Sequence, residues 1–304
     1  MPSLSSLKSP VGSIKTGDTM QGESWKYAAI YILLSIPLNF LSKDILSVSG
    51  PFFLTFVRSA IIAAFLMLMM RRVPKIEPFH ILMASLIYVS TVLWLFSLIF
   101  LTPGDSIVLG YSMPMIAVIL GRFILGEKGR IWISLISLSG FVVYSVPISS
   151  AGSFAGAFIS FLNAFFWALY SVLYRKRINA DPIETNAAIF LIMTLISIPF
   201  TFLEKPPSTE MLQPRYLFDL FWLSIAGGAL QFVSWNKLLL LEGIEKATLE
   251  SYLVPIGVLS TQIFIYGNAP NSLQILGLGI ALFGVFLPEI LGRVSSPSLW
   301  RKKA

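Results

Sequence analysis

The stretch YSMPMIAVILGRFILGE, residues 111–127, places a proline within an otherwise apolar run. The stretch YLVPIGVLSTQIFIYGN, residues 252–268, places tyrosine, proline, a Phe-Ile pair and glycine at matching offsets 141 residues later. Each proline, Pro114 and Pro255, falls about nine residues into its apolar segment, which is roughly 13 Å at 1.5 Å per residue. A proline inside a helix removes a hydrogen bond and frees the carbonyl four residues earlier. Two such features at equal spacing indicate that one structural device occurs twice.

The composition identifies an integral membrane protein. Of the 304 residues, 56% are hydrophobic and 12% are charged, and the mean hydropathy is +0.79. Charge, Pro, Gly and Asn clusters separate ten apolar segments of nearly the length, about 20 residues, that a helix needs to cross a bilayer. Runs such as SAIIAAFLMLMM lack the alternation of a barrel strand, so the segments must be helices. We place the segments at 26–42, 52–70, 79–100, 105–125, 131–147, 153–174, 185–203, 217–241, 247–267 and 273–291.

The positions of Lys and Arg predict the orientation of these helices. With ten crossings, sixteen of these cations lie on the side of the two chain ends and three on the other, namely Lys43, Lys205 and Arg215. The positive-inside rule then predicts cytoplasmic N- and C-termini in the cell (cytoplasmic) membrane. We therefore attribute the formal net charge of +7 to basic residues at the cytoplasmic surface, beside the membrane lipids, and we expect no nucleic-acid partner.

A shift of 141 residues also reveals an internal repeat. Seven identities occur in the 33 gapless columns from 94 to 126. Trp94 aligns with Trp235, Leu98 with Leu239, Tyr111 with Tyr252, Pro114 with Pro255, Phe123 with Phe264, Ile124 with Ile265 and Gly126 with Gly267. The third and fourth segments thus correspond to the eighth and ninth, and the repeat is five helices long. A repeat with an odd number of spans re-enters the membrane upside down, as in many secondary transporters. Duplication that merely built a stable bundle is the alternative.

The runs 94–106, 111–127, 161–177 and 272–287, with the helix count, resemble the EamA-type branch of the drug/metabolite transporter superfamily. The resemblance covers residues 26–291 and implies two five-helix halves around a central cavity that works by alternating access, in many members to export amino acids or other small metabolites. The sequence departs from the family pattern at two places. Ser35-Ile36 occupies the position where the family commonly has Trp-Gly, and Gly126-Glu127 corresponds in the second repeat to Gly267-Asn268.

The fold class that we predict is an all-α integral membrane protein, with ten transmembrane helices arranged as two five-helix inverted repeats around a central cavity. Residues 1–24 would form a disordered cytoplasmic tail, residues 25–147 the first EamA-like repeat, residues 148–292 the second, and residues 293–304 a basic cytoplasmic tail.

The prolines predict either a hinge or a static kink. The carbonyls that they free belong to Gly110 and Ser251, at the depth where a transporter binds its substrate. We favour hinges at Gly110, Pro114, Ser251 and Pro255, while a static kink repaired by a neighbouring hydroxyl group is the alternative.

Charged side chains within the spans are candidates for function. Arg122 and Lys237 lie near cytoplasmic ends and can extend to the headgroups. Arg58 lies nearer the outer side, where it either pairs with Asp105 or Asp44 or binds an anionic group of a substrate; we favour pairing. For Glu250 we favour pairing with Lys246 or Lys237, and proton coupling is the alternative.

Uncharged polar and aromatic residues near the midplane are candidates for lining the cavity. They are Asn163 and Gln231, together with Trp94, Trp167, Trp235, Tyr111 and Tyr252. A cavity of this kind suits a small amphipathic solute, although each residue alone could serve helix packing or an interfacial belt. Gly152 with Gly156, and Gly277 with Ala281, have the spacing of close helix packing.

Enzyme motifs are absent from the sequence. The single histidine, His80, cannot build an HExxH zinc site, there is no cysteine, and no P-loop occurs. We expect no catalytic residues, no metal and no cofactor. The predicted function is ATP-independent movement of a small-molecule substrate, an amino acid or similar solute, outward across the cytoplasmic membrane. A lipid flippase or a polytopic membrane enzyme acting on a lipid is the alternative, and the oligomeric state stays open.

Overall fold

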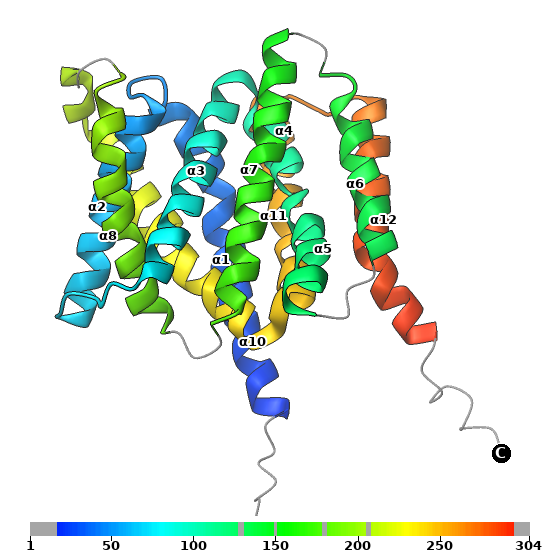
Figure 1. The fold of residues 1–304 in the computed structure, drawn as a ribbon. Coiled ribbons are helices and arrows are strands. Elements are labelled where there is room, and N and C mark those ends of the chain that lie inside the picture. Colours follow the sequence, from blue (N-terminus) through cyan, green and yellow to red (C-terminus); the bar gives the residue numbers. More distant parts are fainter. Residues whose placement is uncertain (1–16, 127–130, 149–150, 178–180, 205–207, 295–304) are drawn as a thin grey trace, which may run out of the picture.

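The structure, a computed structural model, describes residues 17–126, 131–148, 151–177, 181–204 and 208–294. These residues form a bundle of helices and include no strand (Figure 1). Seven helical stretches among them are long and apolar enough to cross a membrane, and two shorter apolar helices accompany them. The predicted all-helical membrane fold is therefore confirmed.

Six helices form the first part of the bundle. They are α1 (Gly17–Ile45), α2 (Pro51–Met70), α3 (Pro78–Phe100), α4 (Pro103–Gly110), α5 (Met113–Leu125) and α6 (Ile131–Ser145). Helix α1 begins within the segment 1–24 that we expected to be a disordered tail, and residues 1–16 lie outside the described residues. Proline begins α2, α3 and α4, which is favourable because the first helical N–H groups need no partner within the helix.

The second part contains α7 (Ala151–Arg175), α8 (Pro182–Thr201), the 3₁₀ turn η1 (Thr209–Leu212), α9 (Pro214–Phe221), the π-helical segment η2 (Trp222–Leu230), α10 (Gln231–Ser251), α11 (Leu253–Tyr266) and α12 (Ser272–Val294). Gly243 has φ 78° and ψ 179°, so α10 is interrupted there and contains two helical pieces. Most of the expected C-terminal tail, residues 295–304, lies outside the described residues.

The two prolines that opened the sequence analysis break their helices. The chain leaves the helix at Tyr111 and Ser112 before α5, and at Tyr252 before α11. Pro114 is the second residue of α5 and Pro255 is the third residue of α11. Each proline thus lies in the first turn after a break of one or two residues, and the choice between a hinge and a static kink stays a prediction. Proline is tolerated in a first helical turn because its missing N–H would have no helical acceptor there.

Other repeated positions also have equivalent surroundings in the two parts. Gly126 after α5 and Gly267 after α11 both adopt the left-handed conformation, with φ of 71° and 68°. Leu98 and Leu239 are both fully buried. Phe123 and Phe264 are both strongly exposed, as suits side chains that face lipid.

The two parts pack against each other along their length. Helix α2 packs on α8, α3 on α7, α6 on α12, and α1 on both α10 and η2. Gly140 and Gly277 permit the closest approach between α6 and α12, since a Cβ on Gly140 would lie 2.4 Å from the backbone nitrogen of Ala281. The small residues Gly277 and Ala281 therefore do serve helix packing.

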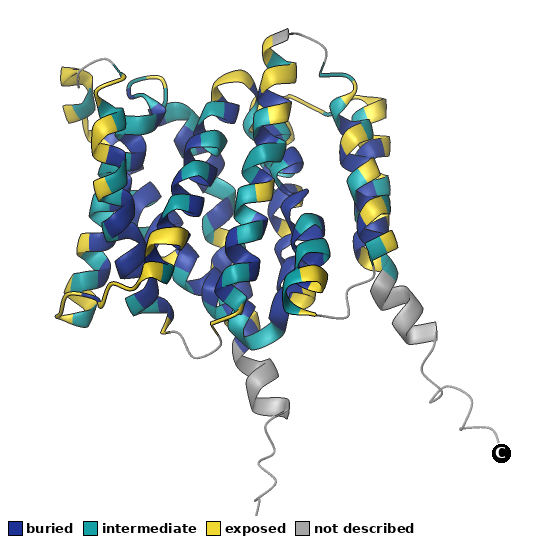
Figure 2. Cartoon of the chain, viewed as in Figure 1, coloured by how far each residue is buried: buried dark blue, intermediate teal, exposed yellow. Residues whose placement is uncertain are grey.

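The outer surface of the bundle is apolar. Exposed side chains include Leu68, Phe154 and Phe264, while buried residues gather in the interior (Figure 2). Such a surface needs a hydrocarbon environment. The start of α1 and the end of α12 lie at the same end of the bundle (Figure 1).

Candidate functional site

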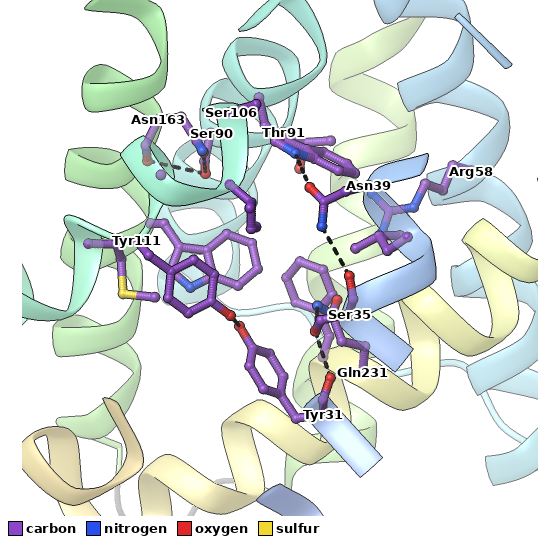
Figure 3. A pocket seen from close by; sticks show the side chains of 17 residues that line it. Tyr31, Ser35, Asn39, Arg58, Ser90, Thr91, Ser106, Tyr111, Asn163 and Gln231 are labelled. Atoms are coloured by element: carbon purple, nitrogen blue, oxygen red, sulfur yellow. Dashed lines mark hydrogen bonds between the residues drawn. The ribbon is translucent and has the colours of Figure 1, made fainter. Parts of the chain in front are cut away.

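A cavity lies inside the bundle (Figure 3), with about 80 Å³ of space for the centre of a water-sized sphere. It is lined mainly by α1, α3, α4 and α7, with contributions from α2, α5 and α10. Its lining combines aromatic rings with short polar side chains: Tyr31, Ser35, Leu38, Asn39, Arg58, Ser90, Thr91, Trp94, Ser106, Ile107, Gly110, Tyr111, Met113, Asn163, Trp167, Gln231 and Phe232. None of these seventeen side chains carries a negative charge.

A polar row on α1 forms one wall of the cavity. Tyr31, Ser35 and Asn39 recur at every fourth position and therefore share one face of the helix. The amide of Gln231 donates to Ser35 Oγ at 2.8 Å, and Trp94 Nε1 donates to Asn39 Oδ1 at 3.3 Å. These bonds join α1 to α10 and α3, so the wall is a connected hydrogen-bond network.

The opposite wall is built from α3, α4 and α7. Ser90 Oγ donates to Asn163 Oδ1 at 2.7 Å, and Ser160 Oγ donates to the carbonyl of Ser106 at 2.9 Å. A side chain on Gly110 would meet only ordinary contacts with Asn163 and Ser160, because the nearest atom lies 3.6 Å away. The last residue of α4 therefore leaves room for a Cβ beside two polar groups.

A buried aromatic cluster closes the cavity at one end. The hydroxyl groups of Tyr31 and Tyr111 lie 3.2 Å apart, as Figure 3 shows. The Tyr252 hydroxyl donates to the Tyr111 carbonyl at 3.0 Å, and the ring of Trp235 packs on Tyr31 with centroids 4.9 Å apart. Both helix breaks, at Tyr111 and Tyr252, thus meet in one layer of side chains.

Arg58 supplies the charge of the cavity. Its side chain is 5% exposed, and it donates from Nε to the Leu223 carbonyl at 2.8 Å and from an Nη atom to the Gly227 carbonyl at 2.7 Å. Its guanidinium carbon lies 5.7 Å from the centroid of the Trp94 ring. Both carbonyls belong to η2, where the wider π-helical turn alters the ordinary helical bonding.

The structure brings most of the predicted cavity residues together. Arg58, Trp94, Tyr111, Asn163, Trp167 and Gln231 all line the cavity, as does the hinge candidate Gly110. Trp235 and Tyr252 lie outside the lining because they are fully buried in the aromatic cluster. Pro114, Ser251, Pro255 and Glu250 are also absent from the lining.

The favoured pairing of Arg58 was wrong. Asp44 instead accepts from Arg215 at 2.7 Å, and Asp105 accepts from Tyr144 Oη and Gln274 Nε2, each at 2.9 Å. Both carboxylates sit near helix ends, where polar partners from neighbouring loops and helices saturate them. Arg58 reaches the carbonyls of η2 instead.

The favoured pairing of Glu250 was also wrong. Lys246 pairs instead with Glu242, which lies four residues before it in the chain, at 2.6 Å. Among the described residues, Glu250 Oε2 is buried without a hydrogen-bond partner. Lys237, the other partner that we considered, lies on the far side of the break at Gly243.

The sequence analysis missed Tyr31, Ser35, Asn39, Ser90 and Ser106. The first three share a fourfold spacing within an apolar segment, and this spacing could have identified the polar face of α1. Ser90 and Ser106 carry no such signal, because a serine inside a membrane helix usually bonds its own backbone.

The cavity offers amide, hydroxyl, indole and guanidinium groups, and no residue of the described ranges belongs to a cluster of three or more His, Asp or Glu side chains able to hold a metal. The arrangement can therefore bind and orient a small molecule. The fold and the cavity together define a multi-pass membrane protein with an internal binding space.

Comparisons with known proteins identify the family. The EamA-like transporter family matches residues 154–288. An uncharacterized transporter in the sor 3′ region of Acidianus ambivalens is 32% identical over 217 residues, which cover 69% of this chain and 83% of that relative. The chain belongs to the EamA-like transporter family, and the resemblance found in the sequence is confirmed.

Two further matches are more distant. An uncharacterized transporter of Archaeoglobus fulgidus (strain ATCC 49558 / DSM 4304 / JCM 9628 / NBRC 100126 / VC-16) is 25% identical over 139 residues, covering 45% of this chain and 48% of that relative. A crystal structure at 18% identity aligns with a TM-score of 0.70 over 90% of this chain and 99% of that chain, which supports the fold.

Proposed function

We propose that this protein is a secondary transporter that exports a small organic metabolite, an amino acid or similar amphipathic solute, by alternating access. The observation that carries the proposal is the cavity, which holds polar groups inside an apolar bundle and lies directly at the break between α4 and α5. Buried polar surface is costly in a membrane and is typical of a substrate path.

We propose ten crossings in two inverted five-helix repeats. The seven long spans include the stretch Pro214–Tyr266, which is interrupted at Gly243 and has the length of two crossings, and two shorter helices bring the number to ten. Helix α2 packs on α8, and α6 on α12, as equivalent helices beside a two-fold axis would. The equivalent positions at the helix breaks and at Gly126 and Gly267 support the same arrangement.

We assign both termini to the cytoplasm of a cell with this protein in its cytoplasmic membrane. The start of α1 and the end of α12 lie at the same end of the bundle, as an even number of crossings requires. That end also holds the basic loops, where Arg72 pairs with Glu184 at 2.7 Å and Arg177 with Glu77 at 3.1 Å. The excess of cations there favours this orientation.

Alternating access in this proposal uses the two breaks as hinges. A helix break can absorb a change of backbone angles with little loss of packing elsewhere. Because Tyr252 donates to the Tyr111 carbonyl, movement at one break would be transmitted directly to the other. Opening of the aromatic cluster would then connect the cavity to the end of the bundle that it closes.

Glu250 is our candidate for proton coupling. Its buried Oε2 atom has no partner among the described residues, and a carboxyl group in such surroundings is stabilised by binding a proton. We expect Glu250→Gln to retain exchange of substrate across proteoliposomes and to lose accumulation driven by a pH gradient. Loss of both processes to the same extent would contradict a coupling role.

Counterflow in proteoliposomes tests the proposed function. Purified full-length protein would be reconstituted and screened with radiolabelled amino acids and amphipathic solutes, with fluorescent phospholipid scrambling measured on the same vesicles. Saturable counterflow of a small solute without lipid scrambling would support the proposal. Scrambling without solute counterflow would overturn it in favour of a lipid flippase.

A further inference from the structure

We propose that the cavity takes a small organic monoanion and that Arg58 binds its carboxylate group. This inference rests on the proposed function, since it names the class of solute that the cavity would carry. It depends on four features of the described structure: the burial of Arg58, the neutrality of its partners, the absence of acidic residues from the lining, and an excess of unmatched donors.

Arg58 carries a full positive charge, and its described interaction partners are all neutral groups. It lies on α2 well inside the span Pro51–Met70, and its described partners are two carbonyl oxygens and one aromatic face. None of the ion pairs among the described residues includes it. A buried guanidinium is stabilised more by a hydrogen-bonded anion than by dipoles alone, and the described part of the chain supplies no such anion.

The position of η2 fixes the guanidinium at the cavity. Gly227 and Gly228 let η2 approach α1 and α2, because a Cβ on either glycine would lie 2.5 Å from a side chain, Leu38 or Ile62 respectively. The two carbonyl bonds use Nε and one Nη atom, which leaves further N–H groups of the fork. In Figure 3 the Arg58 side chain extends toward Asn39, and both residues line the cavity.

The remaining lining groups also favour an acceptor. Trp167 lines the cavity, and its buried Nε1 has no hydrogen-bond partner among the described residues, so a second donor beside the cavity is unmatched. The acceptor Oδ1 of Asn39 is already bound by Trp94, and that of Asn163 by Ser90. A ligand rich in acceptors therefore complements the cavity better than one rich in donors.

The charge of the lining selects among amphipathic solutes. A cationic amine ligand would find no carboxylate to pair with, because no acidic side chain is among the lining residues. A zwitterionic amino acid would satisfy Arg58 with its carboxylate but would place its ammonium group among hydroxyl groups and aromatic rings. A monocarboxylate with an apolar body matches the cation, the aromatic rings and the absence of acidic groups together.

Matched ligands test the proposal on the unmodified protein. Binding of phenylacetate, phenylacetamide, phenethylamine and phenylalanine to the purified full chain in nanodiscs would be measured by calorimetry and by quenching of tryptophan fluorescence. We expect phenylacetate to bind at least tenfold more tightly than its neutral amide, which has the same shape, and phenethylamine to bind least. Equal affinity for acid and amide, or no saturable binding of phenylacetate, isovalerate or benzoate, would overturn the proposal.

Substitutions identify the cation responsible. Arg58→Gln should abolish the preference for acid over amide, and Arg58→Lys should retain part of it because the charge remains while the fork is lost. Lys43→Gln is the matched control, since Lys43 also donates to backbone carbonyls, those of Leu98 and Leu101, but lies outside the cavity lining. We expect Lys43→Gln to leave the preference unchanged. An unchanged preference in a folded Arg58→Gln protein would also overturn the assignment.

The two proposals fail in different ways. Selective binding of the acid without any counterflow would contradict the proposed transport function and support the proposed anion site. Saturable counterflow of amines or neutral solutes, with no preference for carboxylates, would support the proposed transport function and contradict the proposed anion site.

Discussion

The two broken helices carry the same motif but have different surroundings. At the first break, Gly110 and Tyr111 line the cavity, and a Cβ on Gly110 would fit beside Asn163 and Ser160 at ordinary contact distances. At the second break, Ser251 and Tyr252 are buried, and Tyr252 bonds the carbonyl of Tyr111. The difference indicates that the first break forms part of the cavity wall while the second supports it from behind.

The repeated tryptophans show the same division. Trp94 lines the cavity, where its ring faces Arg58 and its Nε1 atom donates to Asn39. Trp235 is fully buried, with its Nε1 atom donating to Ser171 Oγ at 3.2 Å. One repeated residue has thus become a binding surface in the first part of the chain and a packing residue in the second.

Replacing each tryptophan separates these two roles, and the largest effect belongs to Trp235. We expect Trp235→Ala to lower the free energy of unfolding by about 3–5 kcal/mol, because a large buried side chain leaves a cavity. We expect Trp94→Ala to cost clearly less stability, since its ring already borders open space, and to impair solute binding in protein that remains folded. Unfolding in mixed micelles and ligand binding would be measured on both variants. Equal losses of stability would contradict the division.

Replacing each proline tests whether the two breaks act as hinges of equal importance. Alanine removes the ring that keeps the carbonyl four residues earlier at a distance, and it supplies an N–H for that carbonyl if the break closes, so Pro114→Ala and Pro255→Ala should favour a continuous helix. We expect each to reduce counterflow at least tenfold, about 1.4 kcal/mol, with folding intact. Pro199→Ala is the control, because Pro199 lies inside α8, which continues past it. Unchanged counterflow in both variants would support static kinks.

Much of the fold follows from the sequence, for reasons that particular residues illustrate. Each predicted apolar segment is mostly helical, because a long apolar run in lipid has no alternative to the helix. The interruption at Gly243 agrees with the gap that we left between the segments 217–241 and 247–267. The start of α1 could not be placed, because the polar residues from Gly17 onward carry no apolar signal.

The candidate cavity was only partly predictable. Arg58, Asn163 and Gln231 stood out because polar groups are rare within apolar segments. The partner of Arg58 could not be foreseen, since the carbonyls of Leu223 and Gly227 become available through a π-helical segment that leaves no mark in the sequence. Tyr252 could not be told from Tyr111, because the repeat makes the two residues equivalent in sequence and only the packing distinguishes them.

The smallest predicted effects occur where the two parts of the chain are most alike. Gly126 and Gly267 end their helices in the left-handed conformation, and a Cβ on either would meet no atom within 4 Å. Replacement by alanine should therefore cost only the backbone strain of a positive φ, about 1 kcal/mol at each position. We expect Gly126→Ala and Gly267→Ala to lower the unfolding free energy equally, and Gly279→Ala, in the middle of α12 with open space around it, to lower it not at all. Unequal costs at Gly126 and Gly267 would show that the repeats differ even at their helix ends, whereas equal costs would confine the difference between them to the cavity and its support.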